Sequence, residues 1–199
     1  MPYTKSIEQI LLHFTAPTLC DLKPACLFSL SKKDFLKIKA QITLIYEQIK
    51  MAGKDLLIIS RNDSLILFFV YDSALLLKTL QGYNQKKYLL SKGYKFDGKL
   101  KSALDELKSR FIENSCKTFP HEVGLFLGYP LEDVMAFEKY HGENCKFCGT
   151  WKVYGNVDEA CKKMKAYNKC SLECCKLFEQ GMQISKISKY WKKNFQLAW

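Results

Sequence analysis

The sequence lacks any hydrophobic run that is long enough to cross a membrane. Its longest apolar runs, 65–70 and 75–77, fall far short of the roughly 20 residues that a transmembrane helix needs. The first twenty residues hold only a short apolar run at 10–12, and a secretion signal needs about 7–15 apolar residues. We therefore expect a cytoplasmic protein without a membrane span.

The sequence also lacks a complete catalytic or cofactor motif. Gly124 and Gly128 enclose a short apolar segment, but the Gly-Lys-Ser/Thr ending of a phosphate-binding loop and the G-x-G-x-x-G pattern are both missing. Internal repeats, low-complexity segments and linkers are missing as well. These absences exclude the common nucleotide-binding motifs, and they leave open whether the protein is an enzyme.

Cysteine, in contrast, is abundant. The chain has nine cysteines, which is an odd number, and its sequence shows no export signal. We therefore expect reduced thiols rather than a framework of disulfides. Free cysteine behaves as a small apolar residue and is commonly buried. We expect that role for Cys20, Cys26 and Cys116.

Positive charge is concentrated near the carboxy terminus. Residues 162–193 contain nine lysines and two acidic residues, so this segment carries +7 of the +11 net charge. Apolar residues repeat at helical spacing there, which predicts a long basic amphipathic helix over about 171–198. We favour docking of its apolar face onto the core. An acidic protein partner and nucleic acid are alternative partners, of which nucleic acid is not favoured.

Length and apolar content predict a single domain over residues 1–199, because 199 residues at 48% hydrophobic content suit one core. The apolar runs Asp55–Ser60 and Leu65–Tyr71 flank four polar residues, which predicts a hairpin of central strands. Further strands are expected at 25–30, 122–127 and 150–154. A helix is predicted to open at Ser31 and to include Ile49. The fold class is therefore α+β (mixed α/β), with a mixed central sheet of about five strands flanked by helices.

A Cys-x-x-Cys pair gives the best signal for a metal. Cys145 and Cys148, with His141 four residues before the first cysteine, have the spacing of half a zinc site. Structural zinc takes four protein ligands, and an iron–sulfur cluster needs about four cysteines. The missing second pair of ligands could come from Cys170 and Cys174, which lie one helical turn apart, or from His121 or Cys161. Zinc or iron are the candidate ions, while ordinary free thiols and a redox pair are the alternatives.

A second group of residues suits a small flat ligand. The expected strand at 122–127 begins beside His121 and Glu122, whose side chains alternate between its faces, so Glu122 is not expected to orient His121. Aromatic rings nearby can stack on a ligand or pack in the core. The candidate ligand-binding residues are His121, Glu122, Tyr129, Trp151, Lys152 and Tyr154.

Three segments carry a resemblance to a known family. They are FPHEVGLFLGYPLEDV at 119–134, WKVYG at 151–155 and LKPA at 22–25, and with them nearly the whole chain resembles the domain-of-unknown-function 3793 family, found mainly in anaerobic bacteria. The resemblance implies a single-domain cytosolic protein with a link to iron or redox metabolism. It implies no particular activity and no catalytic residue.

These observations support three functional hypotheses. The leading one is a cytosolic accessory protein that binds a small ligand or a metal between the 119–130 and 141–155 segments. The second is a thiol- or histidine-dependent enzyme that uses Cys148 or His121. The third is a nucleic-acid-binding protein that acts through the basic carboxy-terminal helix.

Overall fold

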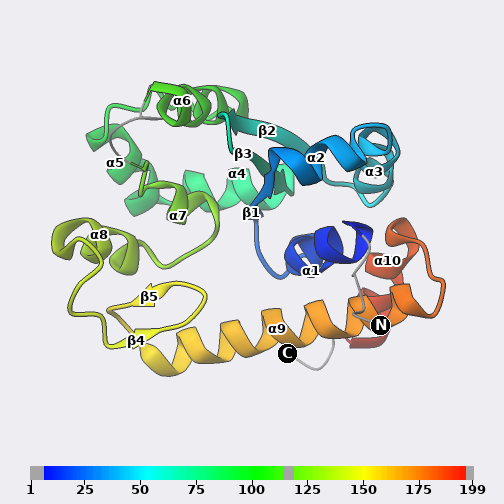
Figure 1. Ribbon diagram of the computed structural model, residues 1–199. Coiled ribbons are helices and arrows are strands. Elements are labelled where there is room, and N and C mark those ends of the chain that lie inside the picture. The colour runs from blue at the N-terminus through cyan, green and yellow to red at the C-terminus, as the bar shows by residue number, and fades with distance from the viewer. Residues whose placement is uncertain (1–6, 114–118, 196–199) are drawn as a thin grey trace. The chain divides into compact units, whose positions relative to one another are not determined.

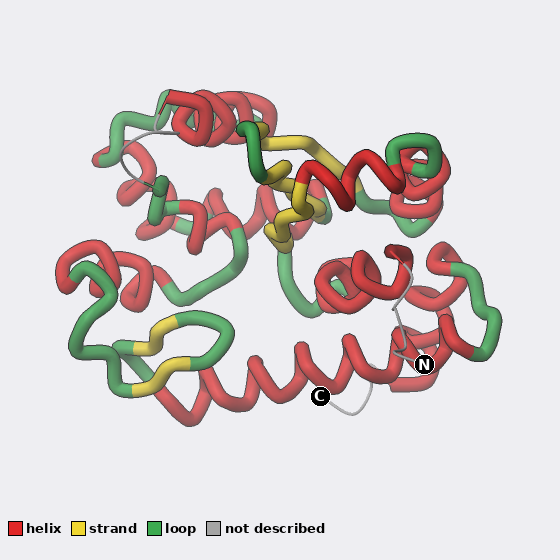
Figure 2. The backbone as a smooth tube through the Cα atoms, in the orientation of Figure 1, coloured by secondary structure: helices red, strands yellow, loops and turns green. Residues whose placement is uncertain are grey.

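The computed structural model describes residues 7–113 and 119–195, and the chain packs as two compact units. The first unit comprises the chain up to Asp72 and from Ala166 onward, and the second comprises Ser73–Lys165. Helices predominate in both units (Figure 2). The sequence leads us to expect one domain over residues 1–199, which stays a prediction, and each of the two units is described by itself below.

A three-stranded antiparallel sheet lies at the centre of the first unit. Its strands β1 (Ala25–Ser31), β2 (Asp55–Arg61) and β3 (Leu65–Tyr71) have the order β1-β3-β2. The β2–β3 hairpin confirms the sequence prediction, and the side-chain oxygen of Asn62 accepts hydrogen bonds from the amides of Ser64 and of Leu65, the first residue of β3. Strand β3 is central and almost continuously buried, as predicted, but β2 is an edge strand.

One face of this sheet forms an apolar core under two helices. Alternate residues of β1 and β3 point into it, and helices α1 (Ile7–Leu19) and α3 (Ile42–Met51) supply the opposite wall. The buried members are Leu11, Cys26, Phe28, Leu30, Ile45, Ile49, Ile66, Phe68 and Val70. Ser31 caps helix α2 (Lys32–Ile38) as expected, but α2 and α3 are separate helices rather than one.

Helix α1 runs through Pro17, a residue type that ordinarily ends or kinks a helix. Proline has no N–H to donate to the carbonyl four residues earlier, which here belongs to His13. The hydroxyl of Ser171 donates to that carbonyl instead, at 2.8 Å. The hydrogen bond joins α1 to helix α9 (Val157–Glu179), and Figure 1 shows the two helices side by side. Helix α1 can therefore extend to the residue before Cys20.

The basic carboxy-terminal segment forms two helices instead of the single helix expected over 171–198. Helix α9 ends at Glu179, and α10 (Ile184–Phe195) follows after a turn at Gly181. Gly181 has φ +90, a conformation that glycine adopts readily and other residues do not. The apolar side of α10 is buried at Ile184, Ile187 and Trp191, which confirms docking for this helix. Residues 196–198 of the predicted helix lie outside the described residues.

The second unit is built from short helices and one small hairpin. Its helices are α4 (Ser73–Gln81), α5 (Tyr83–Ser91), α6 (Leu100–Glu113), α7 (Val123–Phe126) and α8 (Leu131–Tyr140), and α9 begins in it. Strands β4 (Phe147–Cys148) and β5 (Lys152–Val153) pair antiparallel. The strands of the described residues thus form two antiparallel sheets, and the expected single mixed sheet of about five strands is not found. The α+β class is confirmed.

The predicted strand at 122–127 is wrong. Val123, Gly124 and Leu125 donate their amides to carbonyls three residues earlier, which makes a tight helical turn, α7. All four residues of α7 are buried. A short apolar run that is buried on every side has no periodicity by which a strand can be told from a helix.

Candidate metal centre

Three buried cysteines from distant parts of the sequence meet in the first unit. The sulfur of Cys174 lies 3.7 Å from that of Cys20 and 4.0 Å from that of Cys170. All three sulfurs lie within 4.8 Å of one another, and each residue has a relative exposure of 0%. Within the described ranges, no other group of three or more His, Cys, Asp or Glu side chains brings its ligand atoms so close together.

Local sequence places each sulfur. Cys170 and Cys174 are one turn apart on α9, so their side chains share a face of that helix. Cys20 directly follows α1, which the Ser171 hydroxyl holds against α9 beside Cys170. The surrounding core consists of apolar residues that exclude water from the cluster: Leu12, Ala16, Leu19, Ile184, Ile187 and Trp191.

The sulfur separations fit one shared ion. Sulfurs at about 2.3 Å from a common ion are about 3.8 Å apart at tetrahedral corners and about 4.0 Å apart at trigonal corners. The two measured separations, 3.7 and 4.0 Å, match this range. In an iron–sulfur cluster each iron takes its own thiolate, which spreads the cysteines more widely. The geometry therefore suits a mononuclear site rather than a cluster.

A network of charged side chains lies at the edge of the cysteine cluster. Asp21, the residue after Cys20, forms ion pairs with Lys54 through one carboxylate oxygen and with Lys192 of α10 through the other. Lys54 is 4% exposed at its side chain and also pairs with Asp72. The network fixes the segment that carries Cys20, and it places the positive charge of Lys192 where it acts on the Cys20 thiol.

The neighbouring thiols change the acidity of Cys20. Hydrogen bonds from Cys170 and Cys174, helped by the charge of Lys192, lower the pKa of Cys20 from 9.0 to about 5, against the opposing effects of burial and Asp21. The same hydrogen bonds, together with burial, raise the pKa of Cys170. Cys20 therefore loses its thiol proton easily, while Cys170 keeps its proton.

A pH titration of the metal-free protein tests this distribution of charge. We expect one thiolate, seen by its ultraviolet absorbance, to be present at neutral pH and to be protonated as the pH falls through about 5. The step should be absent from Cys20→Ser. It should move to higher pH in Lys192→Met, because that variant loses a favourable charge. An unaltered protein with no thiolate at neutral pH would contradict the assignment.

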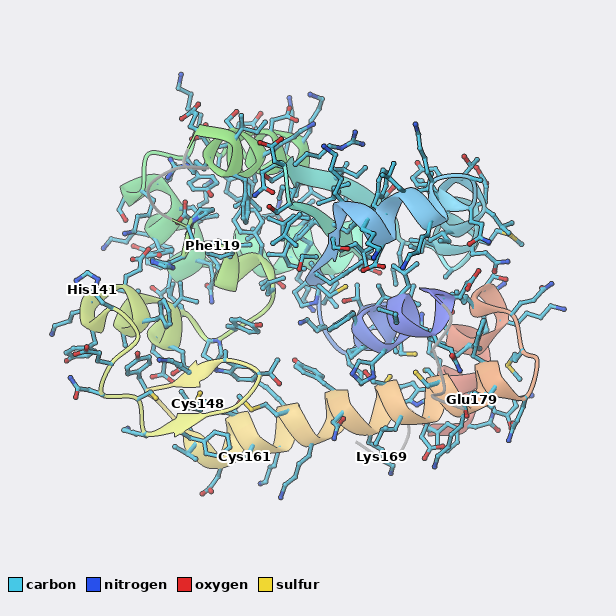
Figure 3. The ribbon with its side chains drawn as sticks, viewed as in Figure 1. Phe119, His141, Cys148, Cys161, Lys169 and Glu179 are labelled. Atoms are coloured by element: carbon cyan, nitrogen blue, oxygen red, sulfur yellow. The ribbon has the colours of Figure 1, made fainter. Side chains whose placement is uncertain are left out.

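The residues predicted as metal ligands lie in the second unit. His141 is exposed at the end of α8, in a left-handed conformation with φ 51. Cys145 is half-buried, and Cys148 is exposed on β4. Figure 3 shows His141 and Cys148 at different elements, the end of α8 and the small hairpin. Their role in binding a metal stays a prediction.

Two of the predicted ligand-binding residues, Trp151 and Tyr154, bind Asp133, which the sequence analysis did not single out. The indole N–H of Trp151 and the backbone amide of Tyr154 donate to its carboxylate, both at 2.8 Å. Tyr129 stacks on Trp151 with ring centroids 4.8 Å apart. Lys152 donates to the carbonyl of Gly142 at 2.6 Å. These contacts fix the hairpin against α8.

The other two predicted ligand residues have separate surroundings. His121 packs edge-on against Phe137, with ring centroids 5.0 Å apart. The buried carboxylate of Glu122 accepts hydrogen bonds from the hydroxyl of Tyr94 and the guanidinium of Arg110, both at 3.2 Å. The contacts that Glu122 makes agree with the expectation that it does not orient His121.

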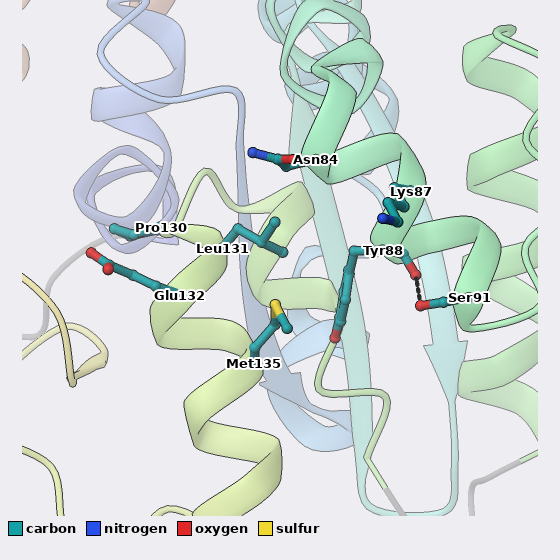
Figure 4. Close-up of a pocket in the computed structure, with 8 residues that line it drawn as sticks. All are labelled: Asn84, Lys87, Tyr88, Ser91, Pro130, Leu131, Glu132 and Met135. Atoms are coloured by element: carbon teal, nitrogen blue, oxygen red, sulfur yellow. Dashed lines mark hydrogen bonds between the residues drawn. The ribbon is translucent and has the colours of Figure 1, made fainter.

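A cavity of about 670 Å³ lies between α5 and α8 in the second unit. Figure 4 shows Leu131 and Met135 of α8 facing Tyr88 of α5. The complete lining is Asn84, Lys87, Tyr88, Ser91, Pro130, Leu131, Glu132 and Met135. None of the predicted ligand residues lines it, although Tyr129 lines a neighbouring cavity of about 230 Å³.

The fold and the site together define an α+β protein that carries a buried three-thiol cluster. A family model described as "Protein of unknown function (DUF3793)" matches residues 11–188, so the chain belongs to this family, as the resemblance of its sequence motifs implies. Comparisons with curated proteins and with solved structures gave no match. None of the helices in the described residues has the length and apolarity to cross a membrane.

Proposed function

We propose that this protein binds a single soft metal ion through Cys20, Cys170 and Cys174. The observation that carries the proposal is the convergence of three fully buried sulfur ligands at separations that suit one ion. Thiolates are soft ligands and favour soft ions such as Cu(I) and Zn²⁺ over Mg²⁺ or Ca²⁺. The charge of Lys192, which acts on Cys20, helps to hold a thiolate ligand in apolar surroundings.

The competing interpretation is a core in which three small thiols simply pack together. Sulfurs in van der Waals contact have similar separations, so the distances alone do not decide between the two. The arrangement of ligands favours an ion, because two residues one turn apart on α9 meet a third that is 154 positions away from Cys174 along the chain. An ion at this point would link α1 to α9, and its binding free energy would add to the stability of the first unit.

Metal analysis of full-length protein, purified without oxygen, tests the proposal. We expect about one soft metal ion per chain, held after dialysis. Replacing a residue that only hydrogen-bonds to a metal ligand typically lowers metal affinity about 10–100-fold. Removing a ligand itself should lower the affinity at least as much. Cys174→Ser, which removes the sulfur in contact with both others, should therefore lose the ion on dialysis.

Cys175→Ser is the matched control, because Cys175 is the next residue on the same helix and is not part of the cluster. It should retain the metal, as should Cys148→Ser. Thermal unfolding of the metal-free forms would separate loss of binding from loss of fold. The proposal is overturned if the unaltered protein, after exposure to Zn²⁺, Fe²⁺ and Cu(I), holds none of them in stoichiometric amount.

The remaining hypotheses stay predictions. Small-ligand binding by the 119–155 segment is weakened by the packing of Tyr129 and Trp151 on each other and by the bonds to Asp133. Thiol-dependent catalysis would use the exposed Cys148, and histidine-dependent catalysis would use His121. The exposed lysines of α10, such as Lys189, are available to an acidic partner or nucleic acid. A cytoplasmic accessory role in iron or redox metabolism fits the proposed metal site.

A further inference from the structure

We propose that the ion held by Cys20, Cys170 and Cys174 is Cu(I), an inference that rests on the proposed function and names its ligand. The argument depends on the number and type of ligand atoms that the structure supplies. The cluster offers three sulfurs, and no histidine nitrogen or carboxylate oxygen joins them among the residues that the structure describes. Copper(I) is soft, prefers thiolates, and is satisfied by three of them in a plane.

Zinc needs a fourth ligand at this site. Structural zinc sites are closed by four protein ligands, and catalytic sites fill the fourth position with water. All three cysteines here have 0% exposure and pack among apolar side chains, so none of the three sulfurs is open to solvent water. A tetrahedral ion would therefore be left one ligand short.

The nearest alternatives for a fourth ligand are otherwise engaged. Both carboxylate oxygens of Asp21 are paired with lysines, one with Lys54 and the other with Lys192. The sulfur of Cys175 lies 4.0 Å from the carbonyl of Gln9 and is not among the clustered ligand atoms. Recruiting either group would break contacts that hold α1, α9 and α10 in place.

The net charge of the occupied site favours Zn²⁺ over Cu(I), but this effect is weaker than that of the coordination number. Three thiolates around a monovalent ion leave more net negative charge in the core than three thiolates around a divalent ion, and burial penalises that charge. The positive charge of Lys192, which already favours the Cys20 thiolate, offsets part of the difference. A missing ligand cannot be offset in this way, so coordination number decides the preference.

Competition titrations of the full-length, reduced, metal-free protein under anaerobic conditions test the inference. Cu(I) is titrated against bicinchoninate, and Zn²⁺ against 4-(2-pyridylazo)resorcinol. We expect one Cu(I) per chain, bound more tightly than Zn²⁺. Its affinity should fall about 100-fold or more in Cys170→Ser and remain unchanged in Cys175→Ser. X-ray absorption of the unaltered copper protein should show three sulfur neighbours and no oxygen or nitrogen, a readout that needs no variant to fold.

The alternative outcomes are distinguishable. Tight Zn²⁺ binding with weak Cu(I) binding, both dependent on the three cysteines, overturns the copper assignment and leaves the thiol metal site intact. If the protein binds neither of these ions and no iron, the result overturns both the copper assignment and the proposed metal site. Cu(I) that persists in Cys20→Ser and disappears in Cys148→Ser would move the site to the hairpin and would also overturn both.

Discussion

Replacement of Asp133 by alanine is expected to lower the free energy of unfolding by about 4 kcal/mol, since each hydrogen bond to a charged group contributes roughly 1.5–3 kcal/mol and orphaned buried donors add a penalty. Asp133 is 2% exposed. Its carboxylate accepts hydrogen bonds from the Trp151 indole and from the amides of Tyr154 and Gly155, each at 2.8 Å. Urea unfolding followed by circular dichroism and tryptophan fluorescence measures the loss.

Asp133→Asn provides a graded control for this prediction. Both amides share one carboxylate oxygen and the indole uses the other, so asparagine can keep two bonds and loses the third. It should cost about half as much as alanine, and less still in a Trp151→Phe background, where the indole donor is gone. Glu143→Ala, at an exposed acid, should stay within about 0.5 kcal/mol. A loss below about 1 kcal/mol for Asp133→Ala would show that this carboxylate does not organise the hairpin.

Replacement of Trp191 by alanine should have a comparable effect in the first unit, because a large side chain deleted from a core costs about 3–5 kcal/mol. Trp191 is 1% exposed and packs in the same core cluster as Cys20, Cys170 and Cys174. The space left by the deleted indole should also admit water and reagents to the thiols. We therefore expect faster alkylation of the cluster cysteines, measured by mass spectrometry, together with a lower urea midpoint.

Two variants separate the loss of volume from other effects. The indole N–H of Trp191 is buried without a hydrogen-bond partner within the described part of the chain, so Trp191→Phe loses volume but no bond and should cost about 1–2 kcal/mol. Tyr190→Ala, at a neighbouring residue that is 43% exposed, should change stability by less than about 0.5 kcal/mol. Unchanged alkylation in Trp191→Ala would contradict the view that this side chain seals the cluster.

Local patterns in the sequence predicted those elements whose periodicity or end signals are distinct. The β2–β3 hairpin and the capping of α2 by Ser31 are of this kind. The expected strand at 122–127 failed because a uniformly buried apolar run has no period. The expected long basic helix is wrong because Gly181, with φ +90, ends α9, and glycine in this conformation is a common end of a helix.

The candidate site shows a similar limit. Sequence spacing identified the Cys145 and Cys148 pair, and it placed Cys170 and Cys174 one helical turn apart. It gave no reason to connect them with Cys20, which was expected to be an ordinary core cysteine. Asp133 was also missed, because an acidic residue in the first turn of a helix is commonly a favourable charge at the helix dipole.

By itself, the sequence determined the α+β class, one hairpin, the family and the reduced state expected of the thiols. Each of these follows from interactions between residues that are close along the chain or from composition. Only the tertiary structure decided which sulfurs meet, because that depends on the packing of α1 against α9 and on the bond from Ser171 to a carbonyl that Pro17 leaves without a donor. Contacts between residues so far apart leave no periodic signal in one sequence.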